Sequence, residues 1–481
     1  MPQLISNARG GKNLVHGGYQ YYIQSKRGAR TYWQCIKKSK KTDGCLGRAI
    51  TQEDPLTVLK TRPHNHAPNN DAIRARTIVN TLRREAAEHP EAQPSRLIRD
   101  NLARVPDAVL AQLPERNLLR RTMNRRRQAE LPQNPRSAEE VENIPLEYQT
   151  TFTGKQFLIF DNLLDREDYG LILIFSTTTN LKILGRSSYW FMDGTFKVSP
   201  SIFLQLFTIH GTYRGNAFPL VFALIQNKEE RTYLKILMEI SIFCTRMGIR
   251  LQEPGTIISD FEKSIINAAL RMYPEVDIRL CFFHLGQSMY RRVQTEGLQV
   301  AYTSPEMPEI KTGVHQLLSL AFVPVEDVEA AFLTLVESLP DDLIPIAAYF
   351  DRVYVRGIII DGVQRRRPQY PPKLWNQYTA AVNNEPRTNN LTEGWHCRFN
   401  HLVGKNHPSF YHLIRELRKE QEDIRGMMRE VSLGKRVKFP QRTEYKRVNR
   451  RLQNLSLQYP QYKEDDEVVD YLRACGHNFN L

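Results

Sequence analysis

Three acidic residues stand in stretches whose chemistry points to a divalent metal site. Asp193 lies within the aromatic-rich stretch FMDGTF, Asp260 ends the predicted strand TIISD, and Glu393 lies in RTNNLTEGWH, near the start of a predicted helix. Neighbouring strand ends can bring two carboxylates within a few ångströms, and a divalent cation relieves their repulsion. Oxygen ligands favour Mg²⁺ or Mn²⁺ over zinc. The alternatives are a helix cap for Asp260 and a merely solvated Glu393.

Two cysteines and two histidines near the N-terminus have the spacing of a structural zinc site. Cys35, Cys45, His64 and His66 form the pattern C-x9-C-x18-H-x-H. Two thiolates and two imidazoles complete the tetrahedral coordination of closed structural zinc sites. The H-x-H pair on an extended segment places both imidazoles on one face, and a region with so little core gains stability from a metal. The alternative is two unrelated cysteines and a polar loop.

The distribution of basic residues suggests a nucleic-acid partner. The 481 residues carry a formal net charge of +15, and residues 1–50 hold ten Lys or Arg against one acidic residue. A polyanion such as DNA binds surfaces of this kind, and a merely basic soluble protein is the alternative. We expect DNA contacts from one aromatic and four basic side chains of this region: Trp33, Lys37, Lys38, Lys40 and Lys41.

The remaining composition bears on the compartment. Six irregularly spaced cysteines do not indicate a disulfide scaffold. The N-terminus lacks the apolar stretch of a signal peptide, and no run approaches the roughly 20 apolar residues that span a bilayer. We therefore expect a soluble protein in a reducing intracellular compartment, which for a DNA-binding protein is the nucleus.

The elements that must position these residues suggest a multidomain chain. Residues 1–72 contain short β-rich runs, and residues 73–145 contain basic helical stretches with spaced prolines and a linker. Within residues 146–425, consecutive strands followed by alternating helices and strands predict a mixed α/β sheet. Residues 297–385 interrupt that rhythm as a helical insertion, and residues 426–481 form a basic helical C-terminal tail.

Two parts of the chain resemble known families. YWQC, the second cysteine and HNH, within about residues 5–70, resemble a FLYWCH-type zinc finger, which implies a small zinc-stapled antiparallel sheet that binds DNA or protein. DGTF, DFEK, CFFH and TNN-x-x-E-G-W-H occur in that order within about residues 150–425 and resemble the Mutator-like (MULE) transposase domain. This second resemblance implies an α/β ribonuclease-H-like catalytic core with a DDE triad, in which Asp193, Asp260 and Glu393 are the successive acids.

Several neighbouring residues are expected to assist the site. Cys281 and His284 form a C-x-x-H pair where a predicted strand becomes a helix, and similar family members carry this pair too. We expect these two residues and His396 to support the active site, with ordinary core packing as the alternative. Trp395 is expected to pack against the sheet, and base stacking is its alternative role.

These features together predict a DNA transposase. Two metal ions among the three acids would activate water or a DNA 3′-hydroxyl and stabilise the leaving oxygen. The reaction would be phosphodiester cleavage followed by strand transfer. The finger, with its structural Zn²⁺, and the helices after it would hold transposon ends, and acting on two ends requires a homodimer or a higher oligomer. The alternatives are a domesticated DNA-binding regulator without catalysis and a host nuclease.

Overall fold

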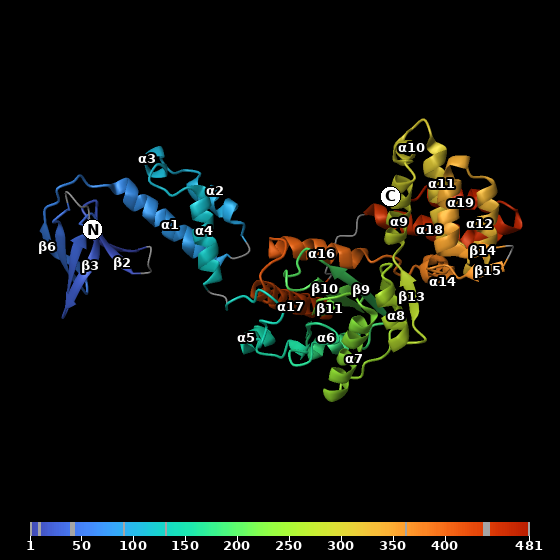
Figure 1. Cartoon of the computed structure of the whole chain (residues 1–481), viewed down its shortest axis with the longest axis horizontal. Coiled ribbons are helices and arrows are strands. Elements are labelled where there is room, and N and C mark those ends of the chain that lie inside the picture. Colours follow the sequence, from blue (N-terminus) through green and yellow to red (C-terminus); the bar gives the residue numbers. More distant parts are fainter. Residues whose placement is uncertain are drawn as a thin grey trace. The chain divides into compact units, whose positions relative to one another are not determined.

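The computed structural model divides the chain into two compact units, Met1–Gln133 and Asn134–Leu481 (Figure 1). Each unit has its own buried apolar residues and is described separately. The described residues are 2–7, 11–38, 44–89, 92–129, 132–360, 363–435 and 443–479.

The first unit begins with a six-stranded antiparallel sheet in which each strand pairs with the next in sequence. Its strands are β1 (Gln3–Ser6), β2 (Lys12–His16), β3 (Tyr19–Arg27), β4 (Arg30–Cys35), β5 (Arg48–Glu53) and β6 (Leu56–Arg62). The buried core of this sheet is Leu14, Tyr21, Trp33 and Ala49. So small a core gives little hydrophobic stabilisation, and domains of this size usually need a metal or disulfides in addition.

A small helical bundle completes the first unit. Its helices are α1 (Asn70–Glu88), α2 (Pro94–Leu102), α3 (Asp107–Leu110) and α4 (Arg116–Gln128). The Asn69 side chain caps α1 by accepting a hydrogen bond from the backbone N–H of Ala72. Apolar side chains at helical spacing from three of these helices form the core: Val79, Leu82, Ala86, Ile98, Leu119 and Met123.

The second unit is built on a seven-stranded mixed sheet with the order β13-β12-β9-β10-β11-β8-β7. Strands β9, β12 and β13 run parallel, and all other pairs are antiparallel. The long apolar runs of β10 and β11 are buried on both faces. The strands are β7 (Leu158–Asp161), β8 (Ile172–Phe175), β9 (Tyr189–Thr195), β10 (Gln205–Tyr213), β11 (Asn216–Ile225), β12 (Thr256–Ser259) and β13 (Asp277–Leu280).

Helices cover both faces of this sheet (Figure 1). On one face, Phe207 of β10 contacts Tyr233 of α7, with 5.0 Å between ring centroids. On the other face, Phe191 of β9 and Ile258 of β12 pack with Leu391 of α16. The helices around the sheet are α5 (Leu146–Gln149), α6 (Thr178–Leu184), α7 (Glu230–Arg246), α8 (Lys263–Met272), α9 (Phe282–Thr295), α16 (Asn390–Val403) and α17 (Phe410–Ser432).

Between α9 and α16 the chain forms a largely helical insertion. It contains α10 (Gln299–Thr303), α11 (Pro308–Ser319), α12 (Val328–Glu337), α13 (Ile344–Phe350), α14 (Pro372–Trp375) and α15 (Tyr378–Val382). The same stretch also contains a two-stranded ribbon, β14 (Ile358–Ile360) and β15 (Val363–Arg366), which the sequence analysis did not anticipate.

The last described helices, α18 (Thr443–Glu464) and α19 (Val468–Gly476), pack against this insertion. The buried Tyr471 hydroxyl of α19 donates a hydrogen bond to the carbonyl of Phe322. His315 of α11 lies 3.0 Å from the carbonyl oxygen of Gly476 through its Nδ1 atom. Across the described residues, no helix has the length and apolar character needed to cross a membrane.

Candidate metal and catalytic sites

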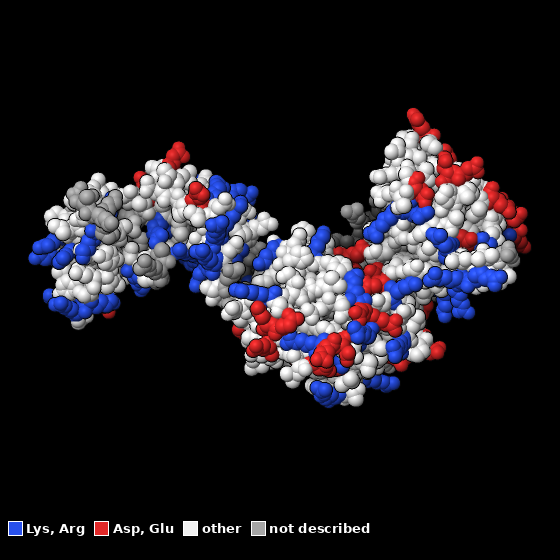
Figure 2. Space-filling view, in the orientation of Figure 1, with Lys and Arg blue, Asp and Glu red and all other residues white. Residues whose placement is uncertain are grey.

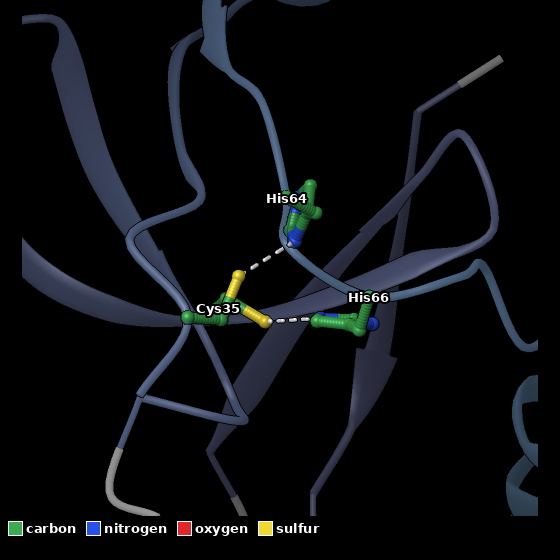
Figure 3. A group of neighbouring side chains, drawn as sticks. Cys35, His64 and His66 are labelled. Atoms are coloured by element: carbon green, nitrogen blue, oxygen red, sulfur yellow. Dashed lines mark hydrogen bonds between the residues drawn. The ribbon is translucent and has the colours of Figure 1, made fainter. Parts of the chain in front are cut away.

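The four predicted zinc ligands meet at one end of the strands of the first sheet. Cys35 ends β4, Cys45 lies between β4 and β5, and His64 and His66 follow β6. Their ligand atoms all lie within 4.8 Å of one another. The Cys35 Sγ atom is 3.3 Å from His66 Nε2, and Cys45 Sγ is 3.2 Å from His64 Nδ1 (Figure 3). A Cys2His2 set this compact fits the tetrahedral coordination of structural zinc.

The outer contacts of the histidines fit the same assignment. His66 Nδ1 is 2.9 Å from the carbonyl oxygen of Ala67, so that nitrogen donates and leaves Nε2 free to ligate. His64 Nε2 is 2.8 Å from the Tyr21 hydroxyl, which leaves Nδ1 free to ligate. Partners of this kind orient a metal-binding imidazole and fix its tautomer. Burial is also the main cause that lowers the pKa of His64, which favours the neutral ring that binds a metal.

The backbone around the two cysteines donates hydrogen bonds to their sulfur atoms. The N–H groups of Lys37 and Gly47 donate to Cys35 Sγ at 3.4 Å and to Cys45 Sγ at 3.3 Å. Hydrogen bonds to sulfur favour the thiolate that zinc requires. At Gly47 a Cβ would lie 2.4 Å from the His64 ring, so a side chain there would displace this ligand. We infer that glycine is required at this position by close approach of the imidazole.

The predicted DNA contacts of the finger have different surroundings. Trp33 is 2% exposed, and its indole N–H donates to the Thr51 hydroxyl at 2.7 Å. Its ring therefore lies in the core and is not available to stack on a base. Lys38 is exposed and Lys37 is half-buried, whereas Lys40 and Lys41 lie outside the described residues.

The register of the second sheet brings Asp193 and Asp260 together. Strands β9 and β12 are parallel neighbours with Met192 opposite Ser259, so Asp193 and Asp260 are the next pair along. Side chains alternate between faces along a strand. The two aspartates therefore lie on the face of the Phe191–Ile258 pair, which α16 covers. Two acidic residues that lie far apart in the sequence are thus neighbours in the sheet.

Helix α16 brings the third acid to the same face. Glu393 lies in its first turn, and Asn389 before the helix is buried against the sheet. The Asn389 side chain donates to the carbonyl of Met192 at 3.5 Å, and its backbone N–H donates to Cys281 Sγ at 3.3 Å. These bonds hold the start of α16 against β9 and the start of α9. Cys281 is therefore a structural anchor for the helix that carries Glu393.

Burial and neighbouring charges raise the pKa of two of the three acids. Burial, followed by the charge of Asp193, raises the pKa of Asp260 to about 7. Burial also raises the pKa of Glu393, and the charges of Asp193 and Asp260 add to that increase. Asp260 Oδ1 is buried without a hydrogen-bond partner in the described structure, and Glu393 Oε1 is buried with only His284 Nε2 near it, at 3.5 Å. Neighbouring buried carboxylates are a donor set that suits a hard divalent cation such as Mg²⁺ or Mn²⁺.

Two histidines flank the acids. His396 Nδ1 lies 3.4 Å from Asp193 Oδ2, and His284 Nε2 lies 3.5 Å from Glu393 Oε1. The charge of His284 is the main factor that opposes the raised pKa of Glu393. Cys281, His284 and Glu393 also have ligand atoms within 4.8 Å of one another. All three residues expected to support the site therefore lie beside it, and their functional roles remain proposals.

The structure adds a polar network behind Asp260 that the sequence analysis missed. Glu262 accepts hydrogen bonds from Lys228 at 2.8 Å and from the Tyr233 hydroxyl at 2.6 Å. The Tyr370 hydroxyl, from the insertion, donates to the carbonyl of Phe261 at 2.6 Å. The acidic residue in DFEK was the available signal for Glu262, whereas Tyr370 had none.

Trp395 packs as expected. Its ring stacks on Phe399 with 4.8 Å between centroids, and its N–H donates to Glu420 of α17 at 2.7 Å. The side chain is 7% exposed. Trp395 thus joins α16 to α17 and the sheet and offers no open ring face for a base.

A stability measurement can test the raised pKa of Asp260. Because its pKa is raised from 3.8 to about 7, the folded state holds this proton more tightly than the unfolded chain. Without a divalent metal, the free energy of unfolding should therefore decrease as the pH rises from about 4 to 7, and it should stay low at higher pH. At pH 8 in EDTA, Asp260→Asn should stabilise the second unit by about 1–3 kcal/mol.

Chemical unfolding at pH 5 and pH 8 measures this effect. The exposed residue Asp342 supplies the control variant Asp342→Asn, which should leave the pH dependence unchanged. Equal pH dependence in the parent and in Asp260→Asn would show that the pKa of Asp260 is not raised.

The finger's metal-ligand set fits a zinc-finger protein, and the family matches add a relation to transposases. Comparison with known families agrees: residues 4–66 match the FLYWCH zinc finger domain, and residues 189–288 match the MULE transposase domain. This chain therefore carries a FLYWCH zinc finger and a MULE transposase domain, as the sequence motifs predicted. The second match contains Asp193 and Asp260 and ends before Glu393.

Curated relatives share the finger by name. The chain is 27% identical over 114 residues to the FLYWCH-type zinc finger-containing protein peb-1 of Caenorhabditis elegans, covering 23% of this chain and 26% of that protein. It is 34% identical over 74 residues to FLYWCH-type zinc finger-containing protein 1 of Mus musculus, covering 15% of this chain and 10% of that protein. The matched regions thus span about a quarter or less of these relatives.

Proposed function

We propose that this protein is a DNA transposase of the Mutator-like class, in which Asp193, Asp260 and Glu393 form a DDE triad. The observation that carries the proposal is that β9, the end of β12 and α16 bring Asp193, Asp260 and Glu393 to one face of the sheet, where Asp260 Oδ1 is buried without a hydrogen-bond partner in the described structure. The sheet order supports it as well. Strands β11-β10-β9-β12-β13 have three antiparallel strands followed by two parallel ones, which is the arrangement expected of a ribonuclease-H-like core.

The carboxylates would hold Mg²⁺ or Mn²⁺. When bound, such a metal supplies Lewis-acid activation of a nucleophilic oxygen and charge stabilisation of a leaving oxygen. The chain's own residues fix the geometry. Asp193 accepts a hydrogen bond from the N–H of Gly194 at 2.8 Å through Oδ1, which leaves Oδ2 beside His396. His284 would orient Glu393 in the same way.

Cleavage of a defined DNA tests the proposal. The substrate is a duplex carrying the terminal repeats that flank the coding region, incubated with the full chain in Mg²⁺, Mn²⁺ or EDTA. We expect strand breaks at the repeat end only with a metal, followed by joining of the 3′-end to a target plasmid. Specific binding without any cleavage would overturn the catalytic proposal.

A second candidate is a transposase-derived DNA-binding regulator without catalysis. The curated relatives favour it, because their names refer only to the zinc finger. This candidate predicts binding through the finger and no metal-dependent breaks, so the cleavage experiment separates the two. Both candidates imply a nuclear protein, and only the transposase requires a dimer or higher oligomer to join two DNA ends.

DNA binding by the first unit should depend strongly on salt. Each phosphate contact releases counterions, so the slope of log affinity against log salt should fall by about 0.9 per lost contact. Replacing Lys37, Lys38, Lys40 and Lys41 with Gln should lower that slope by about 2–4. Fluorescence anisotropy at several salt concentrations measures it.

A second basic group provides the comparison. Lys26, Arg27 and Arg30 are exposed around the β3–β4 turn, and Figure 2 shows Lys and Arg gathered over this sheet. Replacing these three with Gln should change the slope by less than one. A slope that responds only to this second variant would place the DNA surface at the turn instead.

A further inference from the structure

The β14–β15 ribbon in the insertion has an unusual combination of exposure and charge. Three arginines follow one another at its second strand, Arg365, Arg366 and Arg367, and all are exposed. The apolar side chains Ile360 and Val363 are each 51% exposed. In the described part of the chain no third strand pairs with the ribbon. A two-stranded strip that is open on both faces and rich in arginine is suited to a polyanion.

The base of the ribbon is held firmly. Gly357, just before β14, has φ of +87°, and a Cβ there would lie 2.1 Å from the carbonyl oxygen of Arg366. The backbone at Gly357 thus lies in close contact with the backbone at Arg366. Gln364 Nε2 donates to the carbonyl of Arg356 at 2.7 Å, and the Tyr370 N–H donates to the carbonyl of Val353 at 2.9 Å. The ribbon therefore projects from a defined base.

This base is tied to the acidic cluster. The Tyr370 hydroxyl donates to the carbonyl of Phe261, the residue after Asp260, at 2.6 Å. The charge of Asp260 contributes to the raised pKa of Tyr370, although burial is the largest cause. Only three residue steps separate Arg367 from Tyr370, and an extended chain covers about 10 Å in that length. The base of the ribbon, next to Arg367, is therefore tied to the segment that follows Asp260.

We propose that the β14–β15 ribbon is a DNA-binding arm that grips the duplex beside the scissile phosphate. This inference rests on the proposed function. A two-stranded ribbon fits the major groove of B-form DNA, and three arginines can contact phosphates on either side of it. The exposed Ile360 and Val363 can contact thymine methyl groups within the groove. Figure 2 shows a band of Lys and Arg in the region where Figure 1 labels β14 and β15.

The first test is site-specific cross-linking with the full chain. The photoreactive residue p-benzoylphenylalanine replaces Val363, and the probe is the terminal-repeat duplex in Ca²⁺, whose larger and more flexible coordination shell suits catalysis poorly. We expect cross-links to the duplex within about one helical turn of the cleavage point, on the order of 10 base pairs.

The second test removes the charge. Replacing Arg365, Arg366 and Arg367 with Gln should lower cross-linking at least tenfold and reduce the salt slope of binding by about 2–3. The control variant replaces Arg246, Arg250 and Arg271 with Gln. These arginines are exposed. Arg246 ends α7, Arg250 lies between α7 and the start of β12, and Arg271 lies in the last turn of α8, so that Arg250 precedes β12 whereas Asp260 follows it. This control should change cross-linking by less than twofold, with equal thermal stability in both variants.

The outcomes distinguish a failure of the DNA-binding-arm proposal from a failure of the proposed transposase function. Tight DNA binding without cross-links at position 363, with the salt slope unchanged by the arginine variant, would overturn the arm even if the protein cleaves DNA. Cross-links to protein alone would also overturn it. Cross-links that depend on the arginines, in a protein that never cleaves, would support the arm and refute the transposase.

Discussion

Glu393→Gln should abolish metal-dependent strand cleavage and leave DNA affinity within about twofold. The substitution keeps the side chain's size and removes one negative charge from the acidic cluster. An amide is a poorer ligand for a hard divalent cation, so the metal site would be incomplete. Loss of metal activation costs several kcal/mol of barrier, on the order of a thousandfold or more in rate. Binding should persist because the finger and the ribbon are unchanged.

The matched control is Glu309→Gln. Glu309 is exposed and also lies in the first turn of its helix, α11. It therefore loses the same favourable interaction with the helix dipole but lies outside the acidic cluster. Single-turnover cleavage with both variants, together with a gel-shift titration, decides the matter. If Glu393→Gln cut the terminal-repeat duplex at the parent rate, the triad assignment would be wrong and α16 would have only a structural role.

Cys45→Ser should unfold the finger and eliminate its zinc. Serine does not replace a thiolate as a zinc ligand, and in the described part of the finger the buried apolar cluster has only four residues to stabilise the sheet otherwise. Structural zinc contributes about 10–16 kcal/mol of apparent binding energy in small fingers, which exceeds the stability of most domains. Zinc content per chain should fall by one equivalent. Limited proteolysis should then cut within residues 4–66, while the second unit keeps its thermal transition.

Cys244→Ser serves as the control for this loss. Cys244 is buried in α7 and belongs to no metal-ligand group among the described residues. It should reduce stability of the second unit modestly and leave both zinc content and the protease resistance of the finger unchanged. A Cys45→Ser protein whose finger stays protected without zinc would contradict the structural role of the metal.

The zinc ligands and the three acids could be predicted from the sequence for different reasons. The zinc ligands depend on local spacing, because short strands and turns leave few ways to bring two Cys and two His together. The acids depend on the order of motifs along a long chain. Their proximity comes from the parallel register of β9 and β12 and from the anchoring of Asn389 on Cys281. The motifs predicted the residues, and only the fold gave their arrangement.

Trp33 was predicted to contact DNA, whereas the structure buries it, although a signal for burial existed. Trp33 and Cys35 stand two residues apart on one strand, so their side chains share a face. Since Cys35 must point toward the metal and the interior, Trp33 points inward as well. The β14–β15 ribbon had no comparable signal, because strands of three and four residues are too short to show a period. The packing of α18 and α19 on the insertion depends on contacts between distant segments.

That last packing has a consequence for how the protein is made. The insertion leaves the ribosome long before α19, yet Tyr471 and Gly476 of that helix complete its interior against Phe322 and His315. The strands of the seven-stranded sheet and α17, by contrast, all lie before Gly434 in the sequence. During synthesis the strands of this sheet can therefore begin to pair before the insertion that holds the ribbon has its last helices. The part of the second unit that carries the ribbon would then be the last to complete its core.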